Sequence, residues 1–481
     1  MHFLMLLHLL GKWMMLFSTT LIPSIAVSAL YRDGELKYFL LAIVVNLALG
    51  GALWLIGSRQ PFQLRLRDGF ILVVTLWVAT SLIASVHLMF SLGLGLTDAF
   101  FEAASALTTT GSTVLTGLDQ MPPSVLMFRQ LLQWLGGIGV VVSAVALLPM
   151  LGIGGMQLIK AEAPGPFKGE KLTPRIRHTA AVLWKLYLTI TVACAVAYWF
   201  AGMSAFDAIA HSFSTVSTGG FSTHDASMAY FDSWLIECIA IAFMLIGATS
   251  FAVHWMAWRS LSIETYWRSE ELKAFLVIVA LAIVLVAVEL YAAGNRDSLT
   301  QAVRASSFTV VSVITSTGYG IDDFSVWPVF LPMLLIMISF IGGCGGSTAG
   351  GMKVVRFIIL GKAIRRELMS LVHPRAVTLL KLQGGLIDHR ALDSVMGFVS
   401  VYIVLFAALV LLMLGSGMDF DTAFSAVATC INNLGPGLGD VAANFQSVSA
   451  GAKWVLAVTM IVGRLEVFTV LVLLTPTYWK N

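Results

Sequence analysis

Stretches of about 20 consecutive apolar residues recur along the whole sequence, and they constrain the fold more than any other feature. An α-helix of this length crosses the roughly 30 Å hydrocarbon core of a bilayer at 1.5 Å per residue. The ten stretches lie near residues 5–30, 37–57, 70–92, 124–150, 179–202, 229–258, 273–293, 328–361, 391–415 and 450–475. Only 11% of the residues are charged, against roughly 25% in a soluble domain. We therefore expect an all-α polytopic membrane protein.

A second kind of segment lies between alternate apolar stretches from the third onward. Each is a short helical stretch, too polar and too short to cross a bilayer, that ends in Thr, Ser, Asn and Gly. The four segments are Asp98–Gly111, Asp207–Gly219, Gln301–Gly318 and Asp421–Gly435. Their terminal glycines are separated by 108, 99 and 117 residues. This spacing predicts four pseudo-symmetric repeats of helix, re-entrant pore loop and helix around one central pore.

The repeats divide the chain into five regions. The expected boundaries are 1–60 for two extra N-terminal transmembrane helices and 61–155, 156–262, 263–370 and 371–481 for pore repeats 1 to 4. Val27-Ser28-Ala29 also fits a signal-peptidase site, but the hydrophobic residues that precede Lys12 favour a retained first helix.

Charge patterning predicts the orientation of the chain. Basic residues gather in the connections that do not carry the polar segments, and acidic residues flank the segments themselves. The basic residues are Arg59, Arg65, Arg67, Lys160, Lys168, Lys171, Arg175, Arg177, Arg259, Arg268, Lys362, Arg365, Arg366, Arg375, Lys381 and Arg390. Because Lys and Arg are enriched on the cytoplasmic side, the N-terminus is expected to be cytoplasmic and the loops to enter from outside. A net charge of +3, dispersed over such connections, does not indicate a nucleic-acid partner.

The third loop carries the most specific ion-binding signal. It reads Thr315-Ser316-Thr317-Gly318-Tyr319-Gly320, close to the K+ channel filter TVGYG, whose carbonyls replace the hydration shell of the ion. Non-helical backbone is tolerated at membrane depth only where it is buried in protein or lines a water-filled path. A lone TGYG is more often a turn, but glycine at four regular intervals favours a filter.

Motifs spread over nearly the whole chain are similar to those of one transporter family. They are TTTGST, STGGFSTHDASM, NNLGPGLG, LPMLGIGGMQL to APGPFKGEKLTPR, FIGGCGGSTAGGMKVVRF, HPRAV and GRLEVFTVLVLLTPT. In these motifs the chain resembles the membrane subunits of bacterial Trk potassium-uptake systems, of the TrkH/TrkG type, in the Trk/Ktr/HKT superfamily. The resemblance implies a K+ filter made of backbone carbonyls just before and at each key glycine. The filter residues would be Thr109, Thr110, Gly111, Ser217, Thr218, Gly219, Ser316, Thr317, Gly318, Asn433, Leu434 and Gly435.

The eighth apolar stretch is interrupted by a glycine-rich segment, residues 342–351, after only about 14 apolar residues. Six of these ten residues are glycine, and each costs roughly 1 kcal/mol relative to alanine in a helix. We expect an unwound segment below the filter, although Gly346 and Gly350 also fit GxxxG helix packing. The resemblance implies that the segment obstructs the pore as its gate. The gate residues would be Gly342, Gly343, Gly345, Gly346, Ser347, Thr348, Gly350, Gly351, Lys353 and Arg464.

Arg464 is expected inside the last apolar helix, where a charge costs at least about 2.5 kcal/mol unless it meets water or a partner. The resemblance implies that this arginine approaches the gate from across the pore. An ion pair with Glu466 or a neighbouring acid is the structural alternative. Two residues apart on one helix, the two side chains would point in different directions, which disfavours that pair.

Together these features predict K+ uptake across the bacterial inner membrane through a gated, channel-like pore. K+ would be the transported ion, without a covalently bound cofactor. The resemblance further implies a homodimer and a cytoplasmic, TrkA-like regulatory subunit that binds NAD or ATP. A Na+ or poorly selective pathway stays open as an alternative, because the GYG sequence occurs in the third loop only. A membrane-embedded enzyme is disfavoured because Glu289 and Glu466 are almost the only acids within the apolar stretches.

Overall fold

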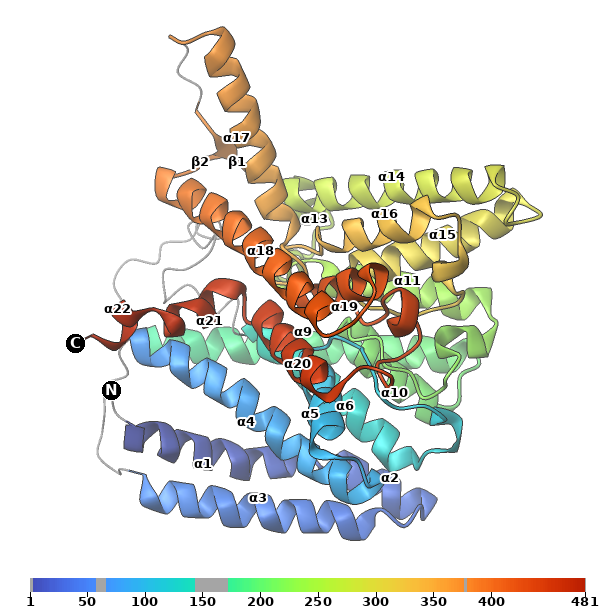
Figure 1. The fold of residues 1–481 in the computed structure, drawn as a ribbon, viewed down its shortest axis with the longest axis vertical. Helices are drawn as coiled ribbons and strands as arrows, with labels where there is room; N and C mark the ends of the chain where they lie inside the picture. Colours follow the sequence, from blue (N-terminus) through green and yellow to red (C-terminus); the bar gives the residue numbers. More distant parts are fainter. Residues whose placement is uncertain (1–2, 58–65, 143–171, 376–378, 481) are drawn as a thin grey trace.

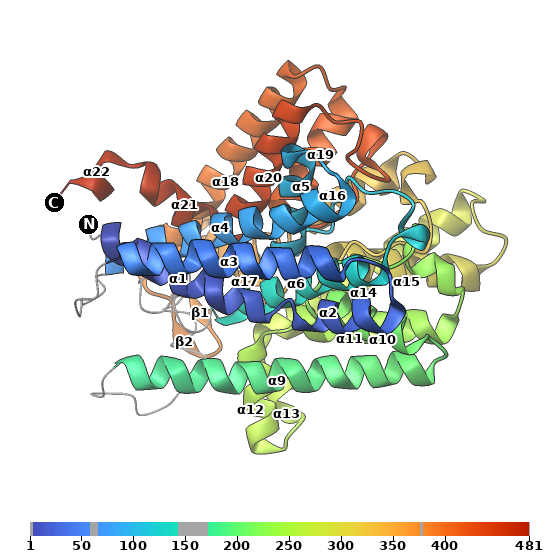
Figure 2. The same cartoon turned by 90° about the horizontal axis from the view of Figure 1, so that it is seen from below.

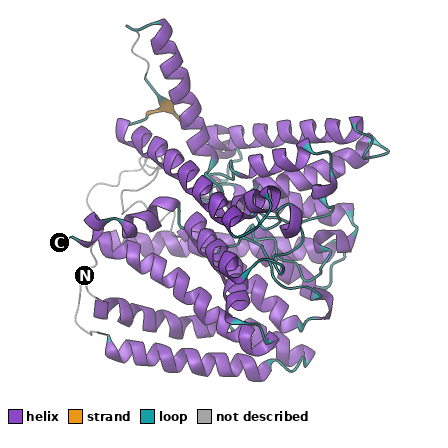
Figure 3. Cartoon of the chain, in the orientation of Figure 1, coloured by secondary structure: helices purple, strands orange, loops and turns teal. Residues whose placement is uncertain are grey.

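The structure is a computed structural model that describes residues 3–57, 66–142, 172–375 and 379–480. Helices form most of the described chain (Figure 3). The chain begins with α1 (Phe3–Thr19), α2 (Ile22–Tyr31) and α3 (Leu36–Ile56). Helices α1 and α3 lie side by side at one edge of the molecule (Figure 1). Gly11 and Gly50 allow this close packing, because a Cβ at Gly50 would lie 2.8 Å from the carbonyl oxygen of Gly11.

After this N-terminal part, the same succession of a long helix, a short buried helix and a second helix occurs four times. The first consists of α4 (Leu66–Leu92), α5 (Leu96–Leu107) and α6 (Pro123–Val142). The second consists of α9 (Leu172–Phe200), α10 (Ala205–Val216), α11 (Trp234–Ala248), α12 (Phe251–Ser260) and α13 (Glu264–Arg268). The third consists of α14 (Glu270–Ala292), α15 (Leu299–Ile314), α16 (Phe330–Ser339) and α17 (Val354–Val372). The fourth consists of α18 (His389–Gly415), α19 (Phe420–Asn432), α20 (Ala450–Arg464), α21 (Val467–Leu474) and α22 (Pro476–Trp479).

Smaller elements connect these helices. In the part of the chain that the structure describes, four short 3-10 helices follow the buried helices, namely η1 (Leu118–Gln120), η3 (Ser227–Phe231), η4 (Phe324–Val326) and η5 (Gly439–Val441). A two-stranded antiparallel hairpin of β1 (Lys381–Leu382) and β2 (Gly385–Leu386) lies between α17 and α18. Helices α12 and α13 project from the body beside α9 (Figure 2). Both ends of the chain lie on the same side of the molecule (Figure 1).

The described chain contains seven helices long and apolar enough to cross a membrane, and up to nine if each of two bent pairs is one span. These nine coincide with nine of the ten expected stretches. The remaining stretch, near 328–361, is divided into α16 and α17 by a non-helical segment, so the break expected at the glycines is confirmed. The structure therefore has the predicted polytopic helical architecture.

Two of the expected continuous helices are sharply bent instead. The stretch near 229–258 bends by 97° between α11 and α12, and the stretch near 450–475 bends by 112° between α20 and α21. At the first bend, the carbonyl oxygen of Ala248 accepts a hydrogen bond from the backbone N–H of Cys344 at 2.8 Å. The backbone N–H of Phe251 donates to the carbonyl oxygen of Gly346 at 3.1 Å. The glycine-rich segment thus satisfies backbone groups that the bend releases, which local sequence did not indicate.

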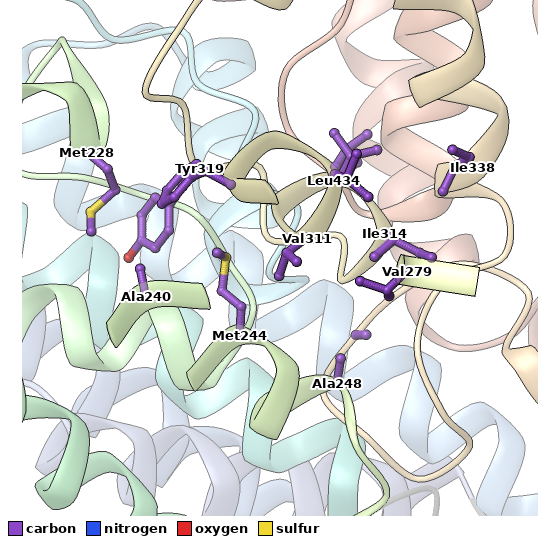
Figure 4. Close-up of a cluster of buried hydrophobic side chains, with 14 of the residues drawn as sticks. Met228, Ala240, Met244, Ala248, Val279, Val311, Ile314, Tyr319, Ile338 and Leu434 are labelled. Carbon is purple, nitrogen blue, oxygen red and sulfur yellow. The ribbon is translucent and has the colours of Figure 1, made fainter. Parts of the chain in front are cut away.

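The core of the molecule surrounds the ends of the short buried helices. One hydrophobic cluster brings together Met228, Ile314, Tyr319 and Leu434, which come from three different successions (Figure 4). This packing fixes the loops that follow α10, α15 and α19 with respect to one another. The short helices therefore hold their carboxyl ends at the centre of the protein, where the candidate site lies.

Candidate functional site

The four short helices end with the same hydrogen bond. In each loop, one backbone N–H donates to the carbonyl oxygen five residues earlier, a bond typical of a helix that ends in a left-handed turn. The pairs are Thr110 to Ser105 at 2.9 Å, Gly219 to Ser214 at 2.8 Å, Thr317 to Ser312 at 2.8 Å and Leu434 to Thr429 at 2.9 Å. The residue just before each donor has a left-handed backbone, namely Thr109, Thr218, Ser316 and Asn433, with φ between 52° and 55°. The four loops are therefore equivalent in backbone conformation.

This equivalence corrects the expected register of the second loop. The residue after each donor is a glycine with positive φ, and these glycines are Gly111, Gly220, Gly318 and Gly435. In the second loop the matching glycine is Gly220, whereas the spacing had selected Gly219. The equivalent residues of that loop are Thr218, Gly219 and Gly220, not Ser217, Thr218 and Gly219. The sequence offered two adjacent glycines, and the hydrogen bond of Gly219 and the positive φ of Gly220 distinguish them.

The four glycines close the loops into a ring. A Cβ at each glycine would lie within 3.0 Å of a carbonyl oxygen in the next loop. The contacts run from Gly111 to Gly219, from Gly220 to Thr317, from Gly318 to Leu434 and from Gly435 to Thr110. Each loop therefore touches the next, and the fourth touches the first. Because any larger residue would meet a backbone carbonyl, glycine is required at these positions for steric as well as conformational reasons.

A cavity of about 440 Å³ lies against this ring. All four positive-φ glycines line it, whereas Gly219 does not, which agrees with the corrected register. Asp225, Asp322 and Asp323 also line the cavity, together with His224 and Arg129. The excess of carboxylates favours the accumulation of cations in this vestibule.

The helix ends favour cations in the same place. Helices α5, α10, α15 and α19 each end at the residue or two before the ring. The carboxyl end of a helix carries a partial negative charge of about half an elementary charge. Four such ends therefore add negative potential at the ring without placing a carboxylate there.

The glycine-rich segment lies on the other side of the ring from the vestibule and contacts three of the four loops. The Thr348 hydroxyl donates to the carbonyl oxygen of Val216 at 3.1 Å. The backbone N–H of Gly350 donates to the Ser316 hydroxyl at 2.5 Å, and that of Gly351 to the carbonyl oxygen of Asn432 at 3.1 Å. Val216 and Asn432 are the last residues of α10 and α19, just before the second and fourth loops, and Ser316 is the left-handed residue of the third loop. Residues 340–353 therefore pass across the base of the ring.

Arg464 lies beneath the same segment. It is the last residue of α20 rather than an interior residue of a continuous helix, because the helix ends there. Its Nη1 donates to the carbonyl oxygen of Thr348 at 2.8 Å, while its buried Nε and Nη2 have no hydrogen-bond partner within the described chain. Glu466 pairs with Arg356 at 2.6 Å. The Nζ of Lys353 donates to the carbonyl oxygen of Ala349. Arg464 and Lys353 thus both donate to backbone carbonyl groups of the segment.

At the rim of the vestibule, His224 joins the first two successions. Its Nδ1 lies 2.5 Å from a carboxylate oxygen of Asp119, its Nε2 lies 3.5 Å from one of Asp207, and its ring stacks on Tyr230. Burial by itself would lower the pKa of His224, but hydrogen bonds and charges from Asp207 and Asp119 outweigh it and raise the pKa. The hydrogen bond from His224 lowers the pKa of Asp119. Protonated His224 therefore links two acidic segments.

This link predicts a pH-dependent contribution to stability. Because the folded pKa of His224 is raised, its contribution is complete below the ordinary pKa of about 6.5 and disappears as pH rises through the folded value. We expect His224→Gln to lower the thermal unfolding midpoint by several degrees near pH 6 and to have little effect near pH 9. Thermal unfolding of both proteins in detergent across this range measures the difference. A gap that widens at alkaline pH would contradict the assignment.

Comparison with known proteins identifies the family. The family model described as TrkH, cation transport protein, matches residues 35–480. The Trk system potassium uptake protein TrkH of Vibrio parahaemolyticus is 48% identical over 485 residues, and that of Escherichia coli (strain K12) is 46% identical over 483 residues. Both alignments cover 100% of each chain. The crystal structure of the potassium transporter TrkH from Vibrio parahaemolyticus superposes with a TM-score of 0.93 at 46% identity, and the match covers 100% of both chains. These names describe transporters and not enzymes. The chain is therefore a membrane protein that belongs to the TrkH family of cation transport proteins.

Proposed function

We propose that this protein mediates K+ uptake through the ring formed by the four loops. The observation that carries the proposal is the closed sequence of contacts from Gly111 to Gly219 and on around to Thr110. Backbone carbonyls from four equivalent loops can replace the hydration shell of a monovalent cation without a fixed charge. The acidic vestibule would supply ions, and the membrane potential would drive them, at about 2.3 kcal/mol per charge per 100 mV.

Conduction would be controlled by residues 340–353, as expected for a gate. In the described arrangement the hydrogen bonds of Thr348, Gly350 and Gly351 hold this segment against the ring, which corresponds to a closed pathway. Arg464 stabilises that arrangement through the Thr348 carbonyl and opposes a cation below the ring by its charge. Opening would require these bonds to break together. The six glycines supply the backbone freedom for such a movement.

K+ is the proposed ion, and Na+ or poor selectivity is the alternative. The relatives are named as potassium uptake proteins, which supports K+. The loops differ in side chain, however, since Leu434 stands where Thr110 and Thr317 stand in the first and third loops. Relative fluxes of K+ and Na+ through purified protein in liposomes distinguish the two candidates.

The wider assembly is also a proposal. The basic connections support a cytoplasmic N-terminus and placement in the bacterial inner membrane, surrounded by lipid. We propose the five expected regions, with boundaries at 60, 155, 262 and 370; in the described chain, α13 follows residue 262 and residue 370 lies within α17. The name Trk system, given to the relatives, supports a partner protein. We propose a homodimer with a cytoplasmic, TrkA-like subunit that binds NAD or ATP.

The filter assignment predicts that Gly220→Ala abolishes K+ flux. The substitution would force a methyl group against the carbonyl of Thr317 and would also strain a backbone with φ of 76°. Gly294→Ala is a matched control, because Gly294 has a similar φ of 69° but nothing within 4 Å of the added Cβ. K+ flux in liposomes, corrected for folded protein, should be lost in the first variant and retained in the second. Normal flux in Gly220→Ala would refute the ring as the ion pathway.

The gate assignment predicts the opposite effect for residues below the ring. Arg464→Ala, or deletion of residues 345–350, should raise basal K+ flux in the absence of any regulatory subunit, because each removes contacts that hold the closed segment. Arg366→Ala, on the far part of α17, is the control for loss of a positive charge. The same liposome assay applies. If both changes lower flux while the protein remains folded, the segment is not a gate.

A further inference from the structure

The second loop of the ring differs from the other three at the residue before the ring glycine. A side chain from another helix fills the space there. Thr110, Thr317 and Leu434 each place a side chain at the ring position that precedes the glycine. The second loop has Gly219 there, without a side chain. A Cβ at Gly219 would lie 2.5 Å from Cδ, 2.6 Å from Oε1 and 2.8 Å from Nε2 of Gln133. The amide of Gln133, which comes from α6 of the first succession, therefore occupies the space that a side chain of the second loop would need.

Gln133 binds the backbone of this loop on both sides of the key glycine. Its Nε2 donates to the carbonyl oxygen of Gly219 at 2.6 Å, and its Oε1 accepts from the backbone N–H of Phe221 at 3.1 Å. One partner is an acceptor and the other a donor, so only this orientation of the amide satisfies both. The side chain is fully buried. The amide thus clamps Gly220 between two fixed backbone groups.

The clamped carbonyl is a member of the ring. The oxygen of Gly219 is the one that lies against Gly111, so it is equivalent to those of Thr317, Leu434 and Thr110. A short hydrogen bond to this oxygen has two effects. It fixes the position of the carbonyl, and it draws electron density from an oxygen that would otherwise be directed only at an ion.

We propose that Gln133 is a positioning residue that sets the ion selectivity of the ring by fixing the Gly219 carbonyl. The proposal rests on the proposed function of the ring as a filter. Selectivity between K+ and Na+ depends on the size of the site and on the number and strength of its carbonyl ligands. Gln133 acts on both quantities at one of the four loops. The second loop consequently contributes a ligand whose geometry is determined by the first succession.

Two other polar residues of α6, Gln130 and Arg129, contact the chain after the ring and not the ring itself. Gln130 donates to the carbonyl oxygen of Phe221 at 3.2 Å, and the guanidinium of Arg129 lies 4.1 Å from the centre of the Phe221 ring. Arg129 also binds Glu102 at 2.7 Å. These contacts anchor the chain after the ring. Of these three α6 residues, Gln133 is the one whose bond reaches a ring carbonyl.

The test compares the ratio of K+ to Na+ flux in full-length variants reconstituted in liposomes. Gln133→Met keeps the length of the side chain and removes both hydrogen bonds. We expect the ratio to fall about three- to tenfold, the range that one hydrogen bond of ordinary net strength accounts for. Thr191→Val is the matched control. Thr191 lies on α9 and accepts a hydrogen bond from Trp134, which lies on α6 like Gln133, and this bond involves no ring residue. The control variant should lower thermal stability to a similar extent without changing the ratio.

A second pair of variants tests the exchange of side chains directly and covers the case in which Gln133→Met does not fold. Gly219→Thr alone would collide with Gln133, and Gln133→Ala alone would leave its space empty. The double variant places a threonine in the second loop as in the first and third. Because threonine fills the space of Gln133 without binding the Gly219 carbonyl, we expect the double variant to recover flux relative to both single variants while keeping a lowered K+ to Na+ ratio. A ratio equal to that of the unmodified protein would overturn the proposal, since the ring would then not need the bond from Gln133.

Two outcomes separate this proposal from the filter itself. If Gly220→Ala loses flux while Gln133→Met keeps a normal K+ to Na+ ratio, the ring is the ion pathway but Gln133 does not set its selectivity. If Gly220→Ala conducts normally, the ring is not the ion pathway, and the proposal for Gln133, which rests on it, is overturned as well. A reduced ratio in Gln133→Met, with an unchanged ratio in Thr191→Val, supports the positioning role.

Discussion

The close approach of backbone carbonyls at the four-loop ring determines the rest of the structure. Each loop can touch the next only where glycine leaves room, and each loop is held by a left-handed turn at the end of a short buried helix. Those helices must therefore point their carboxyl ends at one centre. In lipid, such non-helical backbone would cost several kcal/mol for each unsatisfied group. The long helices that surround the ring exclude lipid from it, and the vestibule supplies water on one side.

The three breaks in the second helices of the later successions form one connected arrangement. Residues 340–353 form the gap between α16 and α17. This segment also contacts the end of α11 and the end of α20. Carbonyls released at Gly247 and Ala248 accept hydrogen bonds from this segment, and Arg464 donates to it. Movement of the segment would expose these groups, so an open state needs water or new partners for them. The hydrogen bonds of these backbone groups thus link the proposed gating movement to the geometry of the helices.

Patterns with a regular period were predictable from sequence. Hydrophobic length located nine spans, and the repeated glycines located the four loops and the break after α16. The register of the second loop was not predictable, because Gly219 and Gly220 are adjacent and their roles depend on Ser214 and Gln133. The bends at Thr249 and Arg464 were also missed, since their stabilising partners lie about 100 residues away along the chain. Contacts between residues that lie far apart in the sequence leave no pattern in the local sequence from which a bend or a register could be predicted.

If the four loops form a single cation site, ion density at the ring will reveal it. Rb+ resembles K+ in size and scatters X-rays anomalously, so crystals grown in Rb+ reveal where such an ion binds. We expect anomalous density on the axis of the ring, bounded by the carbonyls of Thr110, Gly219, Thr317 and Leu434, and its loss when Na+ replaces Rb+. Density confined to other parts of the protein, or equal occupancy in Na+, would contradict it.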